Sequence, residues 1–269
     1  MKAKLFFAGL LVLAFLGTSG SLFAQNKETR NVSGFSAIEA SSVFDITVNK
    51  AGTESLVIEA DEAVMPHVRT EVKNGVLKLY LDDYKGKNIK TIKATIGVKE
   101  LKKVTLSGAS KLTSEDVFNT QKFEMLLSGA CALNLNIKAD KLKVDASGAS
   151  NVTLTAEVQD ARFGASGASN LKVQLKASEV SFWMSGACKA EIKGTAHEAE
   201  YRISGACNVK AEDLICKTAS VKSSGAGKLS LNVSERLDIN SSGSGVVLYK
   251  GRPVLNMNTS GAAKVKSLD

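Results

Sequence analysis

Apolar and polar positions alternate along most of the chain, and short corners of small residues interrupt the alternation at regular intervals. The dipeptide Ser-Gly stands at nine such corners from Ser107 to Ser260, at spacings of 18 to 21 residues. The first and third residues before each Ser are mostly apolar or small, as Ala146 and Val144 are, whereas the residue between them varies freely. Period-two alternation predicts strands with one buried face, and a near-constant repeat predicts a solenoid.

The residues that follow each corner alternate in the same way, which predicts a second strand in every repeat. Helical spacing is absent from the repeats, so leucine-rich and helical repeat folds are excluded. We predict an all-β parallel β-helix, a solenoid with coils of about 19 residues whose equivalent positions form columns about 4.8 Å apart. Each coil consists of a strand, the Ser-Gly corner, a second strand and a return segment such as residues 156–162.

The segment before the first corner has a less regular pattern. It contains alternating strands and the dipeptide Asn74-Gly75, a strong signal for a two-residue β-hairpin turn. We predict that these strands form irregular first coils and an N-terminal capping region that closes one end of the solenoid. The predicted β-helix is a single domain of residues 31–269.

The first residues have the features of a secretory signal peptide. A short basic start, MKAK, precedes an apolar run from Leu5 to Gly17 and small residues that place a cleavage site after Ala24. The run is too short for a typical membrane span, and no second long apolar run follows. We therefore predict a signal peptide of residues 1–24 and an exported mature chain without a transmembrane segment, located in the periplasm, at the outer-membrane surface or outside the cell.

Several motifs occur together in a distinctive order. GFSAIEASSVFDITV begins at Gly34 and NGVLKLYL at Asn74, the Ser-Gly-Ala series follows, and GSGVVLYKGRPVLNMNTSGAAKVKSL begins at Gly243. By these motifs the chain resembles the bacterial family described as putative auto-transporter adhesin, head GIN domain. The resemblance covers nearly the whole mature chain. The resemblance implies a right-handed β-helix of an exported protein, a role in adhesion, and no established catalytic residues.

Charge and acidic residues argue against two function classes. The formal net charge is +8 without a cluster of Lys and Arg, which does not favour a nucleic-acid site.

Many right-handed β-helices cleave acidic polysaccharides with clustered carboxylates, often with calcium. The outward columns are expected to hold scattered single acids such as Asp145, Asp160 and Glu191, never a group stacked over two or three coils. His67 and His197 belong to no nucleophile motif, so we predict a protein that is not an enzyme, without catalytic residues or cofactors.

Three of the four cysteines occupy one repeat position. Cys131, Cys188 and Cys207 stand where other coils carry Ser, Ala or Gly, which indicates a small, buried corner residue. Cys188 and Cys207 lie on adjacent coils, where a disulfide is conceivable although stacked parallel positions have poor disulfide geometry. Cys216 has no obvious partner, and no C-x-x-C pair exists, so we predict no metal site.

One position on the outward columns is a candidate ligand-binding site. Trp183, the only Trp, is preceded on the neighbouring coil by Gly164 and followed on the next by Arg202. An exposed indole beside a glycine gap can stack against a sugar ring while Arg202 hydrogen-bonds hydroxyls or a carboxylate. The alternative is a surface cation–π pair between the two side chains. Three other aromatic residues are predicted to form an inward core column: Phe163, Phe182 and Tyr201.

The favoured function is therefore that of an exported, non-catalytic protein for cell-surface adhesion or glycan binding. Its partner would be a surface polysaccharide or another cell-surface protein, and the candidate site residues are Trp183 and Arg202. A structural scaffold of the periplasm or envelope is the alternative, and it predicts exposed apolar area at an end or side of the solenoid. A polysaccharide lyase-like enzyme is a remote third class, and it predicts a groove with grouped carboxylates.

Overall fold

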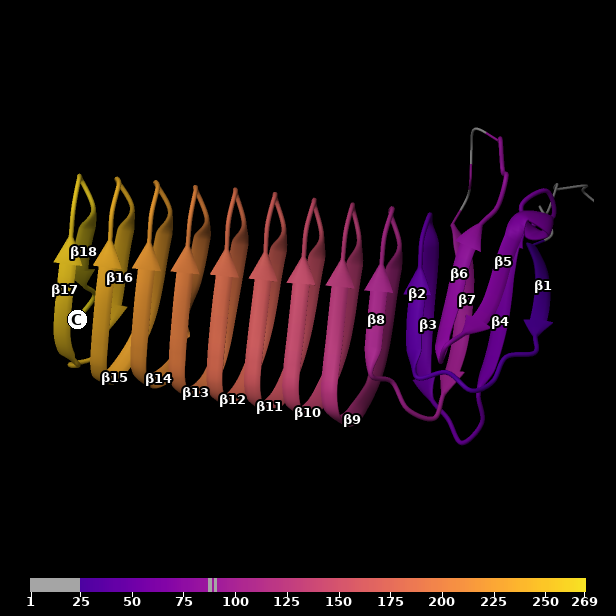
Figure 1. Cartoon of the computed structure of the whole chain (residues 1–269), viewed down its shortest axis with the longest axis horizontal. Coiled ribbons are helices and arrows are strands. Elements are labelled where there is room, and N and C mark those ends of the chain that lie inside the picture. Colours follow the sequence, from indigo (N-terminus) through magenta and orange to yellow (C-terminus); the bar gives the residue numbers. More distant parts are fainter. Residues whose placement is uncertain (1–24, 87–88, 90) are drawn as a thin grey trace, which may run out of the picture.

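A computed structural model describes residues 25–86, 89 and 91–269, so the predicted signal peptide lies outside the described residues. All described strands belong to one sheet that winds into an elongated solenoid (Figure 1). The prediction of an all-β parallel solenoid is confirmed. No helix among the described residues is long and apolar enough to cross a membrane.

The regular coils are formed by long strands that run from one Ser-Gly corner to the next. These strands are β9 (Lys111–Leu127), β10 (Ala132–Ala146), β11 (Asn151–Ala165), β12 (Asn170–Met184), β13 (Lys189–Ile203), β14 (Asn208–Ser223) and β15 (Lys228–Ser241). Each pairs in parallel with the strand of the next coil.

The prediction of separate return segments was wrong. The strands bend at the edge opposite the corners without ending, so residues 156–162 are part of β11 (Figure 1). Their pairing with β12 continues through the bend, for example from Glu157 to Lys176. The next coil therefore satisfies the backbone groups of this segment, which needs no turn structure of its own.

The Ser-Gly corners require glycine because of both backbone conformation and close stacking. Gly167 has a φ of 71°, a left-handed conformation that residues with a Cβ rarely adopt. A Cβ at Gly167 would lie 2.6 Å from the carbonyl oxygen of Gly148 on the preceding coil. That same oxygen accepts a hydrogen bond of 2.8 Å from the backbone N–H of Ala168. The corners thus continue the hydrogen-bonded stack of the strands.

Inside the solenoid, equivalent side chains stack into apolar columns. Phe182 packs between Phe163 and Tyr201 with ring centroids 5.2 and 5.3 Å apart, and all three side chains are fully buried. The predicted inward aromatic column is therefore confirmed. The hydroxyl of Tyr201 is buried without a hydrogen-bond partner in the described structure.

The cysteines also lie inside the solenoid. All four are buried and free, including Cys188 and Cys207 on adjacent coils. The Cys188 thiol donates to the carbonyl oxygen of Ser185 at 3.0 Å, and the buried hydroxyl of Ser169 one coil earlier donates in the same way to Ser166. This equivalence confirms the interpretation of the shared Cys position as a small corner filler.

The N-terminal part is irregular, as predicted. Its elements are β1 (Gln25–Arg30), β2 (Ala37–Ala40), β3 (Phe44–Lys50), β4 (Ser55–Asp61), the 3-10 turn η1 (Met65–His67), β5 (Val68–Lys73), β6 (Val76–Leu81), β7 (Ile92–Val98) and β8 (Lys103–Leu106). Antiparallel pairing of β1 with β4 and of β4 with β7 closes this end of the solenoid (Figure 1). The hairpin of β5 and β6 turns at Asn74 and Gly75, which both have positive φ. β1 precedes residue 31, where the predicted domain begins.

The opposite end is formed by β16 (Val246–Lys250), β17 (Val254–Thr259) and β18 (Lys264–Ser267). Leu255 and Met257 of β17 are in register with Leu237 and Ile239 of β15, which are core residues. Their exposed fractions are nevertheless 38% and 50%. Among the described residues, no coil stacks upon them.

Candidate functional site

The candidate site lies on the outward column nearest to the corners. Each coil contributes the residue two positions before the corner Ser, and strand pairing places these residues in register from coil to coil. In chain order the column is Thr105, Leu126, Asp145, Gly164, Trp183, Arg202 and Lys222. Trp183 and Arg202 are therefore neighbours on consecutive coils, as the repeat predicts.

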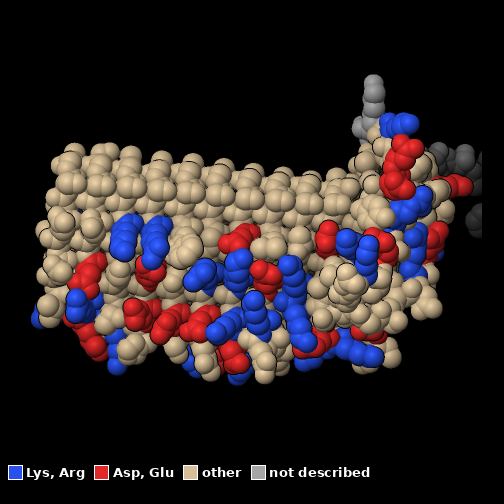
Figure 2. Space-filling view, viewed as in Figure 1, with Lys and Arg blue, Asp and Glu red and all other residues tan. Residues whose placement is uncertain are grey.

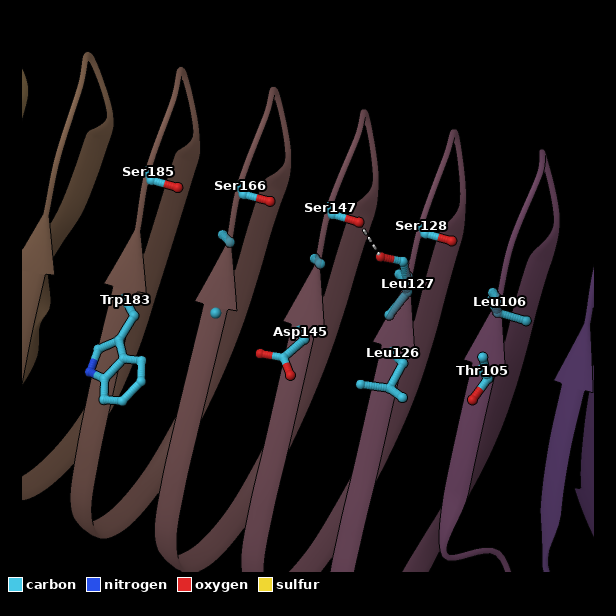
Figure 3. A pocket seen from close by; sticks show the side chains of 13 residues that line it. Thr105, Leu106, Leu126, Leu127, Ser128, Asp145, Ser147, Ser166, Trp183 and Ser185 are labelled. Carbon is cyan, nitrogen blue, oxygen red and sulfur yellow. Dashed lines mark hydrogen bonds between the residues drawn. The ribbon is translucent and has the colours of Figure 1, made fainter.

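A shallow groove of about 470 Å³ follows this column, and we call it the corner groove. Its floor and ends are formed by Thr105, Leu126, Asp145, Gly164 and Trp183, while hydroxyls of the corner serines line one rim (Figure 3). The glycine leaves room in the column, and the Asp145 carboxylate extends over it. The corner groove thus combines an aromatic ring, a carboxylate and hydroxyl groups.

Trp183 lies between two arginine side chains. The guanidinium carbon of Arg202 is 5.1 Å from the centre of the indole, and that of Arg162 is 4.6 Å away. Arg202 also donates from Nε to Glu200 Oε1 at 2.7 Å. The cation–π contact considered from the sequence is present, and Arg162 adds a second one. Because 39% of the Trp183 surface remains exposed, the indole is still accessible to a ligand.

Sequence reasoning missed Arg162 because it considered a single column. Arg162 is the outward residue two positions before Gly164 on β11, so it belongs to the adjacent column. It faces Ser181 of β12 in register, and this small residue leaves space beside the indole. Arg162 lies on the coil before Trp183, in the outward column next to that of Trp183 and further from the corners, and the repeat places it there as well.

Two further hollows lie beside the candidate site, one lined by Trp183 itself and the other by Arg162, which contacts the indole. The Lys222 hollow, about 380 Å³, lies on the far side of the indole from the corner groove and is lined by Trp183, Arg202 and Lys222 together with corner serines. The Lys141 hollow, also about 380 Å³, lies further from the corners. Its charged lining residues are Lys122, Lys141, Lys143, Asp160, Arg162 and Glu179.

An acidic column corrects the expectation that carboxylates never stack. Asp160, Glu179 and Glu198 are in register on β11, β12 and β13, and all three are exposed. The expectation was wrong because it counted Asp160 as a single acid, whereas strand register places Glu179 and Glu198 beside it on the next two coils. Two of these carboxylates also line the Lys141 hollow. Among the described residues, however, no three Asp, Glu, His or Cys side chains are placed to hold a metal ion.

Other charges on this face form ion pairs across the coils. Glu124 accepts from Lys103 at 2.9 Å and from Lys143 at 3.3 Å, and the hydrogen bond from Lys103 is the main cause that lowers the pKa of Glu124. Lys143 also contacts Asp145 at 2.9 Å, and this hydrogen bond is the main cause that raises the pKa of Lys143. Figure 2 shows that charged side chains lie below a band along the corners that carries none.

The sequence profile of the family described as putative auto-transporter adhesin, head GIN domain, matches residues 34–173 and 155–253. The chain belongs to this family. The matched ranges include the corner groove and both hollows. No curated protein matches the chain.

Solved structures share the fold of this family member at low sequence identity. A putative adhesin from Parabacteroides distasonis is 21% identical with a TM-score of 0.74, covering 91% of this chain and 97% of its own. A putative adhesin from Parabacteroides merdae is 18% identical with a TM-score of 0.72, covering 91% and 96%. A putative lipid binding protein from Parabacteroides distasonis is 20% identical with a TM-score of 0.69, covering 91% and 97%. At these identities the similarity shows the fold alone.

Proposed function

We propose that this protein is an exported, non-catalytic adhesin that binds carbohydrate on the outer face of its solenoid at Trp183. The observation that carries the proposal is the accessible indole at the end of the corner groove, with Arg162 and Arg202 beside it. Membership of a family described as adhesins supports this class of function. The same description favours the cell surface as the location and a surface polysaccharide or cell-surface protein as the partner.

The groups around Trp183 have complementary roles in this proposal. The indole stacks on the apolar face of a sugar ring, while guanidinium N–H groups donate to its hydroxyl or carboxylate oxygens. The Asp145 carboxylate accepts from hydroxyls over the gap at Gly164. All of these side chains stand on strands that are paired on both sides, so little backbone ordering is required on binding.

The test is a glycan-array screen of residues 25–269, with and without calcium, beside Trp183→Ala and a control variant. Lys189→Ala is a suitable control because Lys189 is exposed and lies directly after a corner, away from Trp183. The proposal is supported if Trp183→Ala abolishes binding and keeps the circular dichroism spectrum of the wild type, whereas Lys189→Ala still binds. Absence of binding to every glycan contradicts it.

A lyase-like activity is tested in the same preparations. The stacked column of Asp160, Glu179 and Glu198 provides the grouped carboxylates that such an enzyme would use. Incubation with acidic polysaccharides is followed by the ultraviolet absorbance of unsaturated products. If the wild type forms such products and Glu179→Gln does not, an enzymatic function replaces the non-catalytic proposal.

A structural scaffold is the second candidate, and the exposed apolar side chains of β17 favour it. Val254 and Met257 are 75% and 50% exposed, and β17 itself carries no charged side chain. A scaffold that assembles through this strand requires self-association or a bound partner at this end. Light scattering of the wild type and Met257→Lys distinguishes the two functions, because a carbohydrate-binding monomer is unaffected by this change.

A further inference from the structure

Basic side chains cross the outer face of the solenoid on a diagonal. On β9 the basic residue lies in the outward column furthest from the corners, and on β14 it lies in the outward column nearest to the corners. On β12, between these ends, Trp183 stands on the line in place of a basic residue. We call them the basic diagonal: Lys122, Lys141, Lys143, Arg162, Arg202 and Lys222. The five coil steps extend over about 24 Å at 4.8 Å per coil.

The basic diagonal lines two hollows, which the contact between Arg162 and Trp183 links. Lys122, Lys141, Lys143 and Arg162 belong to the Lys141 hollow, whereas Arg202 and Lys222 belong to the Lys222 hollow. The two hollows approach each other at Trp183, where Arg162 and Arg202 both contact the indole. A polymer that follows the diagonal therefore passes over the aromatic ring halfway along its path.

Most cations of the basic diagonal have no acidic partner in the protein. Within the described part of the chain, four of the six have no carboxylate oxygen within 4.0 Å: Lys122, Lys141, Arg162 and Lys222. Arg162 is held by the indole instead, so its N–H donors remain available. The remaining two are paired: Arg202 forms an exposed ion pair with Glu200, which contributes little and exchanges readily for a ligand anion, whereas the half-buried Lys143 is held by Glu124 and Asp145.

We propose that the ligand is an anionic polysaccharide that lies across the coils along the basic diagonal, with one sugar ring stacked on Trp183. This inference rests on the proposed carbohydrate binding and names its ligand class and path. Carboxylate or sulfate groups of the polymer pair with Arg162, Arg202 and the lysines on either side of the indole. The acidic column of Asp160, Glu179 and Glu198 borders the path and repels a polymer displaced toward it.

The charge pattern favours a sparsely charged polymer over a nucleic acid. Six carboxylates share the face with the six cations: Glu124, Asp145, Asp160, Glu179, Glu198 and Glu200. Because the two signs balance, the face has no large positive field of the kind that attracts closely spaced phosphates. A polysaccharide with one charge per sugar or per disaccharide can place its anions on the diagonal and avoid the acids.

The experiment compares polymers that share a sugar backbone and differ in charge. Polygalacturonate and its methyl ester form one pair, and dextran sulfate and dextran form the other, with single-stranded DNA as a further polyanion. Binding of residues 25–269 is measured by calorimetry at two salt concentrations. Lys141→Ala/Arg162→Ala removes two charges from the diagonal, and Lys172→Ala/Lys210→Ala removes the same charge from exposed positions on strand segments just after the corners.

We expect at least one acidic polymer to bind about tenfold or more tightly than its neutral counterpart, because charge-assisted hydrogen bonds to guanidinium contribute strongly. The Lys141→Ala/Arg162→Ala variant and Trp183→Ala should each lose this binding, whereas the Lys172→Ala/Lys210→Ala variant should retain it. Equal binding of acidic and neutral polymers overturns the inference. An equal loss in both double variants, or stronger binding of DNA that Trp183→Ala leaves unchanged, also overturns it.

The outcomes separate this inference from the proposed function. If neutral glycans bind through Trp183 and acidic polymers do not bind, the proposed function remains and the basic diagonal is removed as its site. If no polymer in either pair binds and the glycan array is also empty, both proposals fail together.

Discussion

The guanidinium of Arg162 lies 4.6 Å from the indole centre of Trp183, although the two residues are 21 positions apart and belong to different outward columns. This contact joins the column nearest to the corners to the next one. It therefore connects the corner groove with the Lys141 hollow, and it places the only Trp of the chain where charged and aromatic recognition can act together.

Arg162→Ala is predicted to shift the fluorescence emission of Trp183 to longer wavelengths, because removal of the guanidinium exposes more of the indole to water. The protein has one Trp, so intrinsic fluorescence reports this site alone. Lys172→Ala changes an exposed residue near the start of β12 that lines none of the hollows at Trp183, so it should leave the spectrum unchanged. Identical spectra for Arg162→Ala and the wild type would show that the contact does not persist in solution.

Tyr201→Phe is predicted to raise the free energy of unfolding by about 1 kcal/mol, because it removes a buried hydroxyl that has no hydrogen-bond partner. The ring remains stacked on Phe182, so packing is retained. Urea unfolding followed by circular dichroism measures the change. A loss of stability of similar size would mean that the hydroxyl has a partner, such as a bound water.

Gly186→Ala is predicted to lower the free energy of unfolding by more than about 2 kcal/mol. Gly186 has a φ of 86°, and a Cβ there would lie 2.7 Å from the carbonyl oxygen of Gly167. Gly52→Ala is the matched control, because a Cβ at Gly52 meets no atom within 4 Å. Equal effects of the two substitutions in urea unfolding would contradict the steric argument for the corners.

The ion pairs of Glu124 should stabilise the protein at neutral pH and lose their effect in acid. Its pKa is lowered in the folded state, mainly by the hydrogen bond from Lys103, so the carboxylate form is favoured by folding. The stability is present above the unfolded pKa and is lost as the pH falls through the lower folded value.

The measurement for Glu124 is the difference in urea midpoint between the wild type and Glu124→Gln as a function of pH. We expect the wild type to be more stable at pH values well above 4.5, the ordinary pKa of this group, and the difference to disappear below it. A difference that is independent of pH would assign the effect to packing instead of charge.

The buried thiols should not react with Ellman's reagent in the folded protein near pH 8. Burial raises the pKa of Cys216 to about 12 and that of Cys188 to about 11, so these two carry almost no thiolate, and burial shields all four sulfur atoms from the reagent. In denaturant all four cysteines should react, which provides the control. Rapid labelling of the native chain would show that the corner columns open.

Much of the fold could be predicted from the sequence because the information is local and repeated. The alternation around Val144 and Ala146 assigns the buried face of a strand, and the recurring glycines mark corners where a Cβ cannot fit. The turn at Asn74 and Gly75 is equally local. The return segments were interpreted wrongly, because pairing with the next coil, and not local turn chemistry, decides their conformation.

The candidate site depended more on the tertiary structure. The neighbour relation of Trp183 and Arg202 follows from the repeat, since residues 19 positions apart stack in one column. The contact with Arg162 and the stack of Asp160, Glu179 and Glu198 required all outward columns to be placed beside one another. The sequence by itself thus determined the coil, its corners and its core, because these depend on patterns within one repeat. Which charges meet across the coils was decided only by the tertiary structure, because lateral neighbours depend on strand register and on the direction in which each long side chain extends.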